Sequence, residues 1–101
     1  MIETKIKAEC GVKEDQAEVF KSMLAADLVE TQSFEGCKGI DIFEDQEKSV
    51  FHALSNWSSY SDYDKYLAWR TEQGIGDLLG PMLEGGFPEG LLVRKVEKVD
   101  I

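Results

Sequence analysis

The chain of 101 residues has the length of one domain, and its 43% hydrophobic and 31% charged residues indicate a folded protein rather than a disordered one. With 11 Lys and Arg against 20 Asp and Glu, its formal charge of −9 argues against a surface for nucleic acid or for an anionic membrane. We therefore expect a single domain over residues 1–101.

The first third of the sequence predicts a strand followed by a helix. Residues 2–10 alternate between apolar and polar side chains, which is typical of a strand with one buried face. Residues 15–31 then place apolar side chains three and four apart, as on an amphipathic helix. Asp15 and Glu18 have the D-x-x-E spacing of a helix start.

The remainder predicts three strands and a second long helix. The expected strands are 39–44, 49–57 and 91–99, and the expected helices are 60–73 and a short one at 77–83. Ser58, Ser59 and Ser61 are candidate N-caps for the long helix. The alternation of the last strand slips near Arg94-Lys95, which predicts a bulge there.

The order of these elements, β-α-β-β-α-β, is that of the ferredoxin-like split βαβ plan. We therefore expect an α+β fold with an antiparallel sheet and both helices on one face. The strand over 49–57 is apolar on both parities, so its outer face needs a second cover. A second copy of the chain, in a homodimer, is the simplest cover. The outer face of the first strand is charged, and we expect it to lie away from the centre of that interface.

Several classes of site are not expected. The N-terminus lacks the apolar core of a signal peptide, and no apolar run reaches the roughly 20 residues of a membrane span, so we expect a cytoplasmic protein. Cys10 and Cys37 are interpreted as two small buried residues rather than a redox pair. Their spacing and the single histidine, His52, predict no metal site.

The helix over 60–73 carries the pattern with most bearing on function. Its helical phase places Tyr63, Tyr66, Leu67 and Arg70 on one face, with Trp69 on the flank beside Tyr66. These side chains either pack as ordinary core or form the aromatic wall of a pocket for a planar ligand. Likewise, the Arg70 head group either meets a protein carboxylate or the end of its helix, or binds a ligand oxygen in a cavity.

Polar residues on the strand over 49–57 add hydrogen-bonding groups. His52 and Asn56 share one parity of this strand, whereas Trp57 has the other, so only some of them can face one pocket. A lone strand histidine is either a packed or surface residue or, in a cavity, a proton carrier. Acidic residues are numerous, but no pair has the spacing of a carboxylate dyad.

Residues 31–45, TQSFEGCKGIDIFED, resemble the T-x-x-E-P-G-C-x-x-Y passage of the antibiotic biosynthesis monooxygenase family. Val50-Phe51 and Trp57-Ser58-Ser59 are similar to that family's F-x-x-x-E-x-W-x-s strand. Tyr66-Leu67 falls where the family commonly has His-Leu. The resemblance covers about residues 2–99, with Ser55 in place of the strand glutamate and Glu35 in place of the turn proline.

This resemblance implies a homodimeric α+β barrel that oxygenates phenols or quinols with O2, without metal or flavin. It also implies that Arg70 or Asn56 stabilises the substrate oxyanion. The candidate catalytic residues are Asn56, Tyr66 and Arg70, and the candidate ligand-binding residues are His52, Trp57, Tyr63 and Trp69.

Two alternatives remain open on the same fold. A non-catalytic ligand-binding or structural dimer would keep the fold without the chemistry. A haem-degrading enzyme of the same superfamily would need an Asn on the first strand, a Trp on the second helix and a later His as iron ligand. Here the first strand has no Asn, Tyr66 occupies the Trp position, and no His lies near Gly76.

Overall fold

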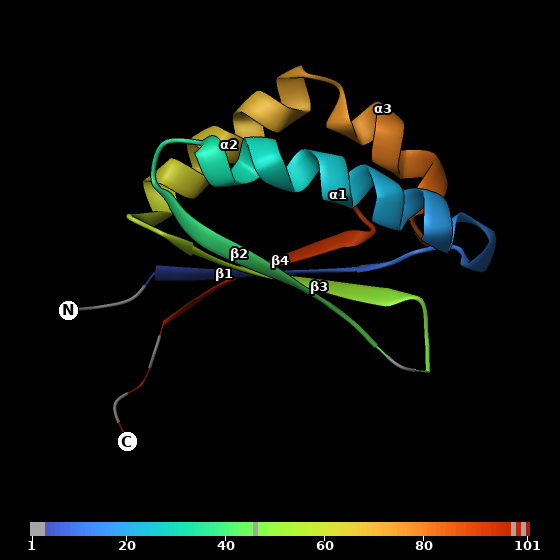
Figure 1. Cartoon of the computed structure of the whole chain (residues 1–101), viewed down its shortest axis with the longest axis horizontal. Helices are drawn as coiled ribbons and strands as arrows, with labels where there is room; N and C mark the ends of the chain where they lie inside the picture. The colour runs from blue at the N-terminus through green and yellow to red at the C-terminus, as the bar shows by residue number, and fades with distance from the viewer. Residues whose placement is uncertain (1–3, 46, 98, 100) are drawn as a thin grey trace.

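A computed structural model of the chain describes residues 4–45, 47–97, 99 and 101. It contains a four-stranded antiparallel sheet of strand order β2-β3-β1-β4, and all the helices cover one face of this sheet (Figure 1). The elements are β1 (Thr4–Gly11), α1 (Ala17–Ser33), β2 (Cys37–Glu44), β3 (Val50–Trp57), α2 (Tyr60–Glu72), α3 (Ile75–Leu79) and β4 (Leu91–Glu97). The predicted ferredoxin-like α+β fold is therefore confirmed.

The ends of the elements depart from prediction in a few places. Residues 2, 3 and 98, which belong to the predicted first and last strands, lie outside the described residues. The predicted cap at Asp15 is wrong, because a short 3₁₀ turn, Glu14–Gln16, precedes α1 and Gln16 caps the helix without a side-chain bond. Ser59 does cap α2, since its hydroxyl accepts from the Asp62 amide at 3.2 Å. The predicted short helix begins at Ile75 and continues as a 3₁₀ turn, Gly80–Met82.

The predicted bulge near Arg94 and Lys95 is also wrong, since β1 and β4 stay in register from Thr4–Glu97 to Cys10–Leu91. Lys95 lies on the helix-facing parity, but β4 is an edge strand. Its side chain can therefore extend past the edge of the sheet toward solvent, where its amine lies 3.3 Å from the Asp64 carboxylate. The irregularity in this sheet lies instead in β2, between Cys37 and Gly39.

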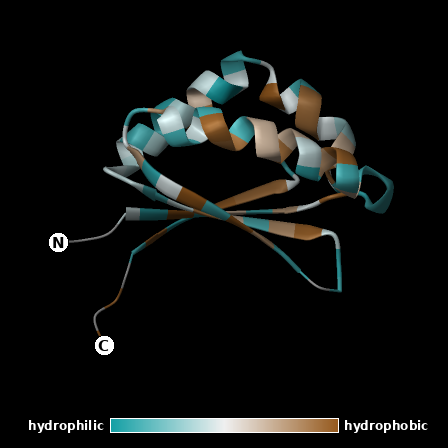
Figure 2. Cartoon of the chain, in the orientation of Figure 1, coloured by the Kyte–Doolittle hydropathy of each residue, from teal (hydrophilic) through white to brown (hydrophobic). Residues whose placement is uncertain are grey.

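Two clusters of buried side chains occupy the space between sheet and helices. One contains Cys10, Val12, Phe20, Phe51 and Leu83, and the other contains Ile6, Trp57 and Tyr63. Hydrophobic residues recur along the strands and along α1 and α3 (Figure 2). On the two central strands, the Ala8–Ala53 pair lies between the Ile6–Ser55 and Cys10–Phe51 pairs. Two small side chains therefore separate the two clusters at the middle of the sheet.

Among the described residues, no helix lies on the other face of the sheet (Figure 1). We expected the charged outer face of β1 to lie away from the centre of a dimer interface on this face. However, β1 is an inner strand, so Lys7 and Glu9 lie between β3 and β4. Strand order depends on long-range pairing, which the local alternation does not encode. In the described part of the chain, no helix is both long and apolar enough to cross a bilayer.

Candidate functional site

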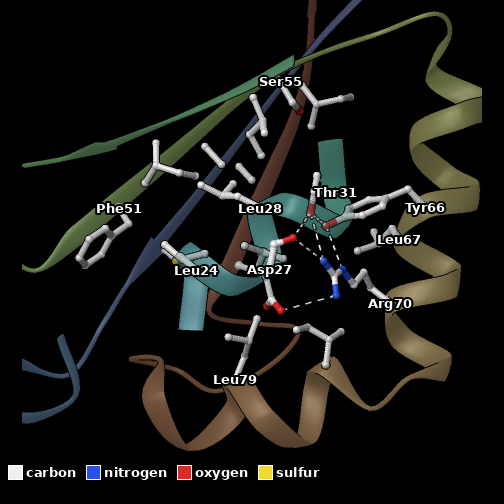
Figure 3. A pocket seen from close by; sticks show the side chains of 18 of the residues that line it. Leu24, Asp27, Leu28, Thr31, Phe51, Ser55, Tyr66, Leu67, Arg70 and Leu79 are labelled. Carbon is white, nitrogen blue, oxygen red and sulfur yellow. Dashed lines mark hydrogen bonds and ion pairs between the residues drawn. The ribbon is translucent and has the colours of Figure 1, made fainter. Parts of the chain in front are cut away.

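A cavity of about 150 Å³ lies between the sheet and the helical layer (Figure 3). Its floor includes Ala8 and Ala53, the pair that separates the two core clusters. Because alanine side chains end at Cβ, they leave space beneath the helices that larger residues would fill. Most of its walls are apolar, and they come from all four strands, from the three helices and from the loop before β4.

One face of α1 supplies a wall that changes from apolar to polar along the helix. Phe20, Leu24 and Leu28 line the cavity first, and Asp27 and Thr31 continue the same helical face toward the C-terminal end of α1. The spacing of three and four residues brings all five toward the sheet. The polar end of this face lies against α2, where Tyr66 and Arg70 are found (Figure 3).

Arg70 on α2 is the centre of the polar part of the cavity. Its side chain is only 8% exposed, yet its donors have partners on both helices. Nε donates to the Tyr66 hydroxyl at 3.1 Å, and Nη2 donates to the Asp27 carbonyl and to Thr31 Oγ1, each at 3.1 Å. Nη1 donates to Glu30 at 3.3 Å and lies 3.8 Å from the Asp27 carboxylate. Arg70 therefore ties the C-terminal part of α1 to α2.

The surroundings of Arg70 keep it cationic. Burial lowers the pKa of Arg70, but the hydrogen bond with Tyr66 and the charges of Asp27 and Glu30 outweigh burial, so the net shift is upward. The Tyr66 hydroxyl accepts from Arg70 and lies 2.8 Å from Thr31 Oγ1. A cationic guanidinium with two carboxylates beside it thus borders a largely apolar cavity, where its remaining N–H can donate to a ligand oxygen.

Aromatic rings close the cavity beside this polar cluster. Trp57 is 2% exposed, and its Nε1 donates to Ser55 Oγ at 2.8 Å. The Trp57 ring centroid lies 5.2 Å from that of Tyr66 and 5.5 Å from that of Tyr63. Burial, with smaller contributions from Tyr66 and Asp64, raises the pKa of Tyr63 to about 12, so its phenol stays protonated near neutral pH. Tyr63 is therefore part of the aromatic wall rather than an acid–base group.

No protein-family model and no curated protein matches this sequence. Solved structures match it along nearly its whole length. One described as an antibiotic biosynthesis monooxygenase superposes with a TM-score of 0.80 at 16% identity, over 96% of this chain and 99% of the other. A candidate antibiotic biosynthesis monooxygenase from Deinococcus radiodurans superposes with a TM-score of 0.79 at 15% sequence identity, over 97% of this chain and 94% of the other. Another, from Bordetella bronchiseptica, superposes with a TM-score of 0.74 at 16% sequence identity, over 98% of this chain and 99% of the other.

The chain has the antibiotic biosynthesis monooxygenase fold. Identities of this size show the fold alone. A protein of unknown function from Nitrosomonas europaea superposes equally well, with a TM-score of 0.78 at 14% identity over 100% of this chain and 93% of that one. One fold hosts many functions, so the function of this cavity depends on the residues that line it.

Within this fold, four of the seven residues predicted from the sequence line the cavity: Trp57, Tyr63, Tyr66 and Arg70. Trp69 lies behind them, with its ring centroid 5.3 Å from that of Phe34 and 5.1 Å from the Arg70 guanidinium carbon. Trp69 therefore supports Arg70 from outside the cavity lining.

His52 and Asn56 lie on the other face of the sheet from Trp57, as their opposite strand parity indicated, and neither lines the cavity. Side chains alternate along a strand, so both lie on the outer face of β3, opposite the helices. His52 Nδ1 lies 3.2 Å from a carboxylate oxygen of Glu9 on that face. Asn56 Oδ1 is buried there without a hydrogen-bond partner among the residues that the structure describes.

Asp27, Thr31 and Ser55 line the cavity but were not among the predicted site residues. The sequence did contain a signal for each. Asp27 and Thr31 fall on the apolar face of the first helix, and Ser55 shares the parity of Phe51 and Trp57. A polar residue in an apolar register marks a side chain that needs a buried partner.

The two cysteines are free, as expected, although they differ in burial. Cys10 is buried and lines the cavity, whereas Cys37 is half-buried. Burial, with a smaller effect of Glu9, raises the pKa of the Cys10 thiol to about 11. Cys10 is therefore a protonated apolar wall residue near neutral pH rather than a nucleophile.

A surface hollow of about 310 Å³ adjoins the cavity at the junction of α2 and α3. The two spaces share Asp27, Arg70 and Ile75, and Gln73 contributes to the hollow. The Arg70–Asp27 pair therefore stands at the boundary between an apolar interior and a space open to water.

Proposed function

We propose that this protein binds a single-ring phenol or quinol in the cavity and oxygenates it with O2, as a cofactor-independent monooxygenase. The observation that carries the proposal is one cavity lined by Trp57, Tyr66 and Arg70 and otherwise mostly apolar. A dry apolar cavity of about 150 Å³ is large enough to bind benzene in another protein. The volume thus favours one aromatic ring, and Arg70 favours a ring that carries an ionisable oxygen.

The proposed reaction needs no electrons from outside the substrate. The phenolic O–H ionises, which makes the ring electron-rich, and Arg70 holds the resulting oxyanion. One oxygen atom of O2 then forms a C–O bond at a ring carbon that loses its hydrogen. The other oxygen atom leaves as water, while the quinol becomes a hydroxyquinone. Each molecule of O2 consumed therefore oxidises one molecule of quinol.

Oxygen uptake with single-ring quinols and phenols tests this proposal. Tyr66→Phe removes the hydroxyl that accepts from Arg70 Nε and so positions the guanidinium that holds the oxyanion, and we expect oxygen uptake about 10²-fold slower than in the wild type. Tyr60→Phe is the matched control, because the Tyr60 hydroxyl donates to the Val96 carbonyl at the sheet edge and its loss should leave the rate unchanged. Absence of uptake by the wild type across the panel would refute the enzymatic proposal.

A second candidate function, a non-catalytic binding protein, is favoured by one specific observation. Four of the five N–H donors of Arg70 are already engaged by Tyr66, Thr31, the Asp27 carbonyl and Glu30. A guanidinium that mainly joins two helices has fewer donors left to stabilise a developing charge. Ligand binding without oxygen consumption would support this second function.

We also propose that the single domain over residues 1–101 pairs with a second copy through the uncovered sheet face. Phe43, Leu92 and Val96 are exposed there although they belong to strands. A domain of this size also buries only about two-thirds of its unfolded surface and gains from such a cover.

Size-exclusion chromatography with light scattering tests the dimer. The wild type should elute at about twice the chain mass of 11.4 kDa. Phe43→Asp should shift the mass to that of one chain, because it places a charge at a side chain that is 55% exposed in the single chain. Val19→Asp, at 52% exposure on α1, is the control and should remain dimeric. A monomeric wild type at micromolar concentration would contradict the proposal.

A further inference from the structure

We propose that Asp27 accepts the hydrogen bond of the ligand hydroxyl and then takes its proton. This inference rests on the proposed function, because it assigns a role within the same cavity. Asp27 is the acid among the described residues that line the cavity. It projects from α1 beside Arg70, where its carboxylate and the guanidinium lie together (Figure 3).

The backbone and the side chain of Asp27 have different partners. The Asp27 carbonyl accepts from Arg70 Nη2 at 3.1 Å and from Thr31 Oγ1 at 3.2 Å, which fixes this turn of α1. The carboxylate Oδ1 lies 3.8 Å from Arg70 Nη1, which exceeds hydrogen-bond distance. Asp27 Oδ1 and one N–H of Arg70 Nη1 are therefore not hydrogen-bonded to each other. A ligand hydroxyl between them could accept from Arg70 and donate to Asp27.

Glu30 provides a contrast on the same guanidinium. It accepts from Arg70 Nη1 at 3.3 Å, but its side chain is 60% exposed, whereas that of Asp27 is 27% exposed. Asp27 lines both the cavity and the surface hollow. Of these two carboxylates that pair with Arg70, Asp27 is thus the one placed to meet a ligand in the cavity.

Because Asp27 lies between the cavity and the surface hollow, it can also pass the proton on to water. In the proposed step the ligand O–H bond breaks, an H–Oδ bond forms on Asp27, and the electron pair stays on the ligand oxygen beside Arg70. The proton then leaves Asp27 for water in the hollow beside Gln73. The phenolate that remains is the electron-rich species that reacts with O2.

Binding of phenol and its methyl ether, anisole, tests the hydrogen bond without requiring turnover. Both have one ring and an oxygen acceptor, but anisole has no donor. By calorimetric titration we expect the wild type to bind phenol at least about tenfold more tightly than anisole. Asp27→Leu should reduce this preference to within about twofold, because no acceptor remains. Glu30→Gln is the matched control and should keep the wild-type preference.

Asp27→Asn separates hydrogen bonding from proton transfer. An amide oxygen still accepts a hydrogen bond, so we expect the variant to keep most of the preference for phenol, but it cannot take the proton, so oxygen uptake should fall about 10²-fold. This variant also serves if Asp27→Leu does not fold. Equal binding of phenol and anisole by the wild type, or full oxygen uptake by Asp27→Asn, would overturn the role of Asp27. Failure of the wild type to bind either compound would instead overturn the proposed function.

Discussion

Replacing Arg70 with methionine is expected to lower the free energy of unfolding by about 2–4 kcal/mol. The variant keeps much of the apolar stem but removes the donors that join α2 to Asp27, Thr31 and Glu30 of α1. The estimate rests on the buried bonds to Tyr66, Thr31 and the Asp27 carbonyl, because the half-exposed ion pair with Glu30 contributes little. Urea denaturation followed by circular dichroism measures the change.

Lys65→Met is the matched control for this experiment. Lys65 is exposed on α2, away from the uncovered sheet face, so we expect the free energy of unfolding to change by less than about 0.5 kcal/mol. Arg70→Lys should fall between the two, since an ammonium keeps the charge but cannot reproduce the planar set of donors. If Arg70→Met were as stable as Lys65→Met, the hydrogen bonds of Arg70 would not stabilise the packing of α2 against α1.

The sequence predicted the fold because its local patterns agree with each other. Strict alternation over β1 and helical spacing over α1 and α2 indicate which face of each element is buried. The same phase argument correctly placed Tyr63, Tyr66 and Arg70 toward the cavity. In these cases the buried face is set by spacing within one element, which is local information.

The parts that could not be predicted depend on which elements meet. Arg70 and the Asp27 carbonyl are 43 residues apart, and their hydrogen bond follows from the packing of α1 on α2. Sequence spacing offered two partners for Arg70, a protein carboxylate or a ligand, and the structure supplies the protein partners. The cavity itself needs Ala8 and Ala53 to face each other, which requires the pairing of β1 with β3. Neither relation is visible in the pattern of a single element.

Replacing Ala53 with leucine is expected to weaken the binding of phenol at least tenfold, about 1.4 kcal/mol, with little loss of stability. Ala53 lies on the central strand β3, opposite Ala8, and forms part of the cavity floor. The larger side chain would occupy the space of the ring. Since this space is already present, we expect the free energy of unfolding to change by less than the roughly 1–3 kcal/mol typical of overpacking. Calorimetric titration with phenol and urea denaturation measure the two quantities.

Ala26→Leu adds the same atoms at an exposed position of α1 and should leave the affinity unchanged. A loss of affinity in Ala53→Leu alone would place the ligand between the sheet and the helices, whether or not the protein is an oxygenase. Unchanged affinity in both variants would place it elsewhere, for example in the surface hollow beside Gln73. The comparison thus locates the ligand by volume, whereas the variants of Tyr66 and Asp27 test what the polar groups do once the ring is bound.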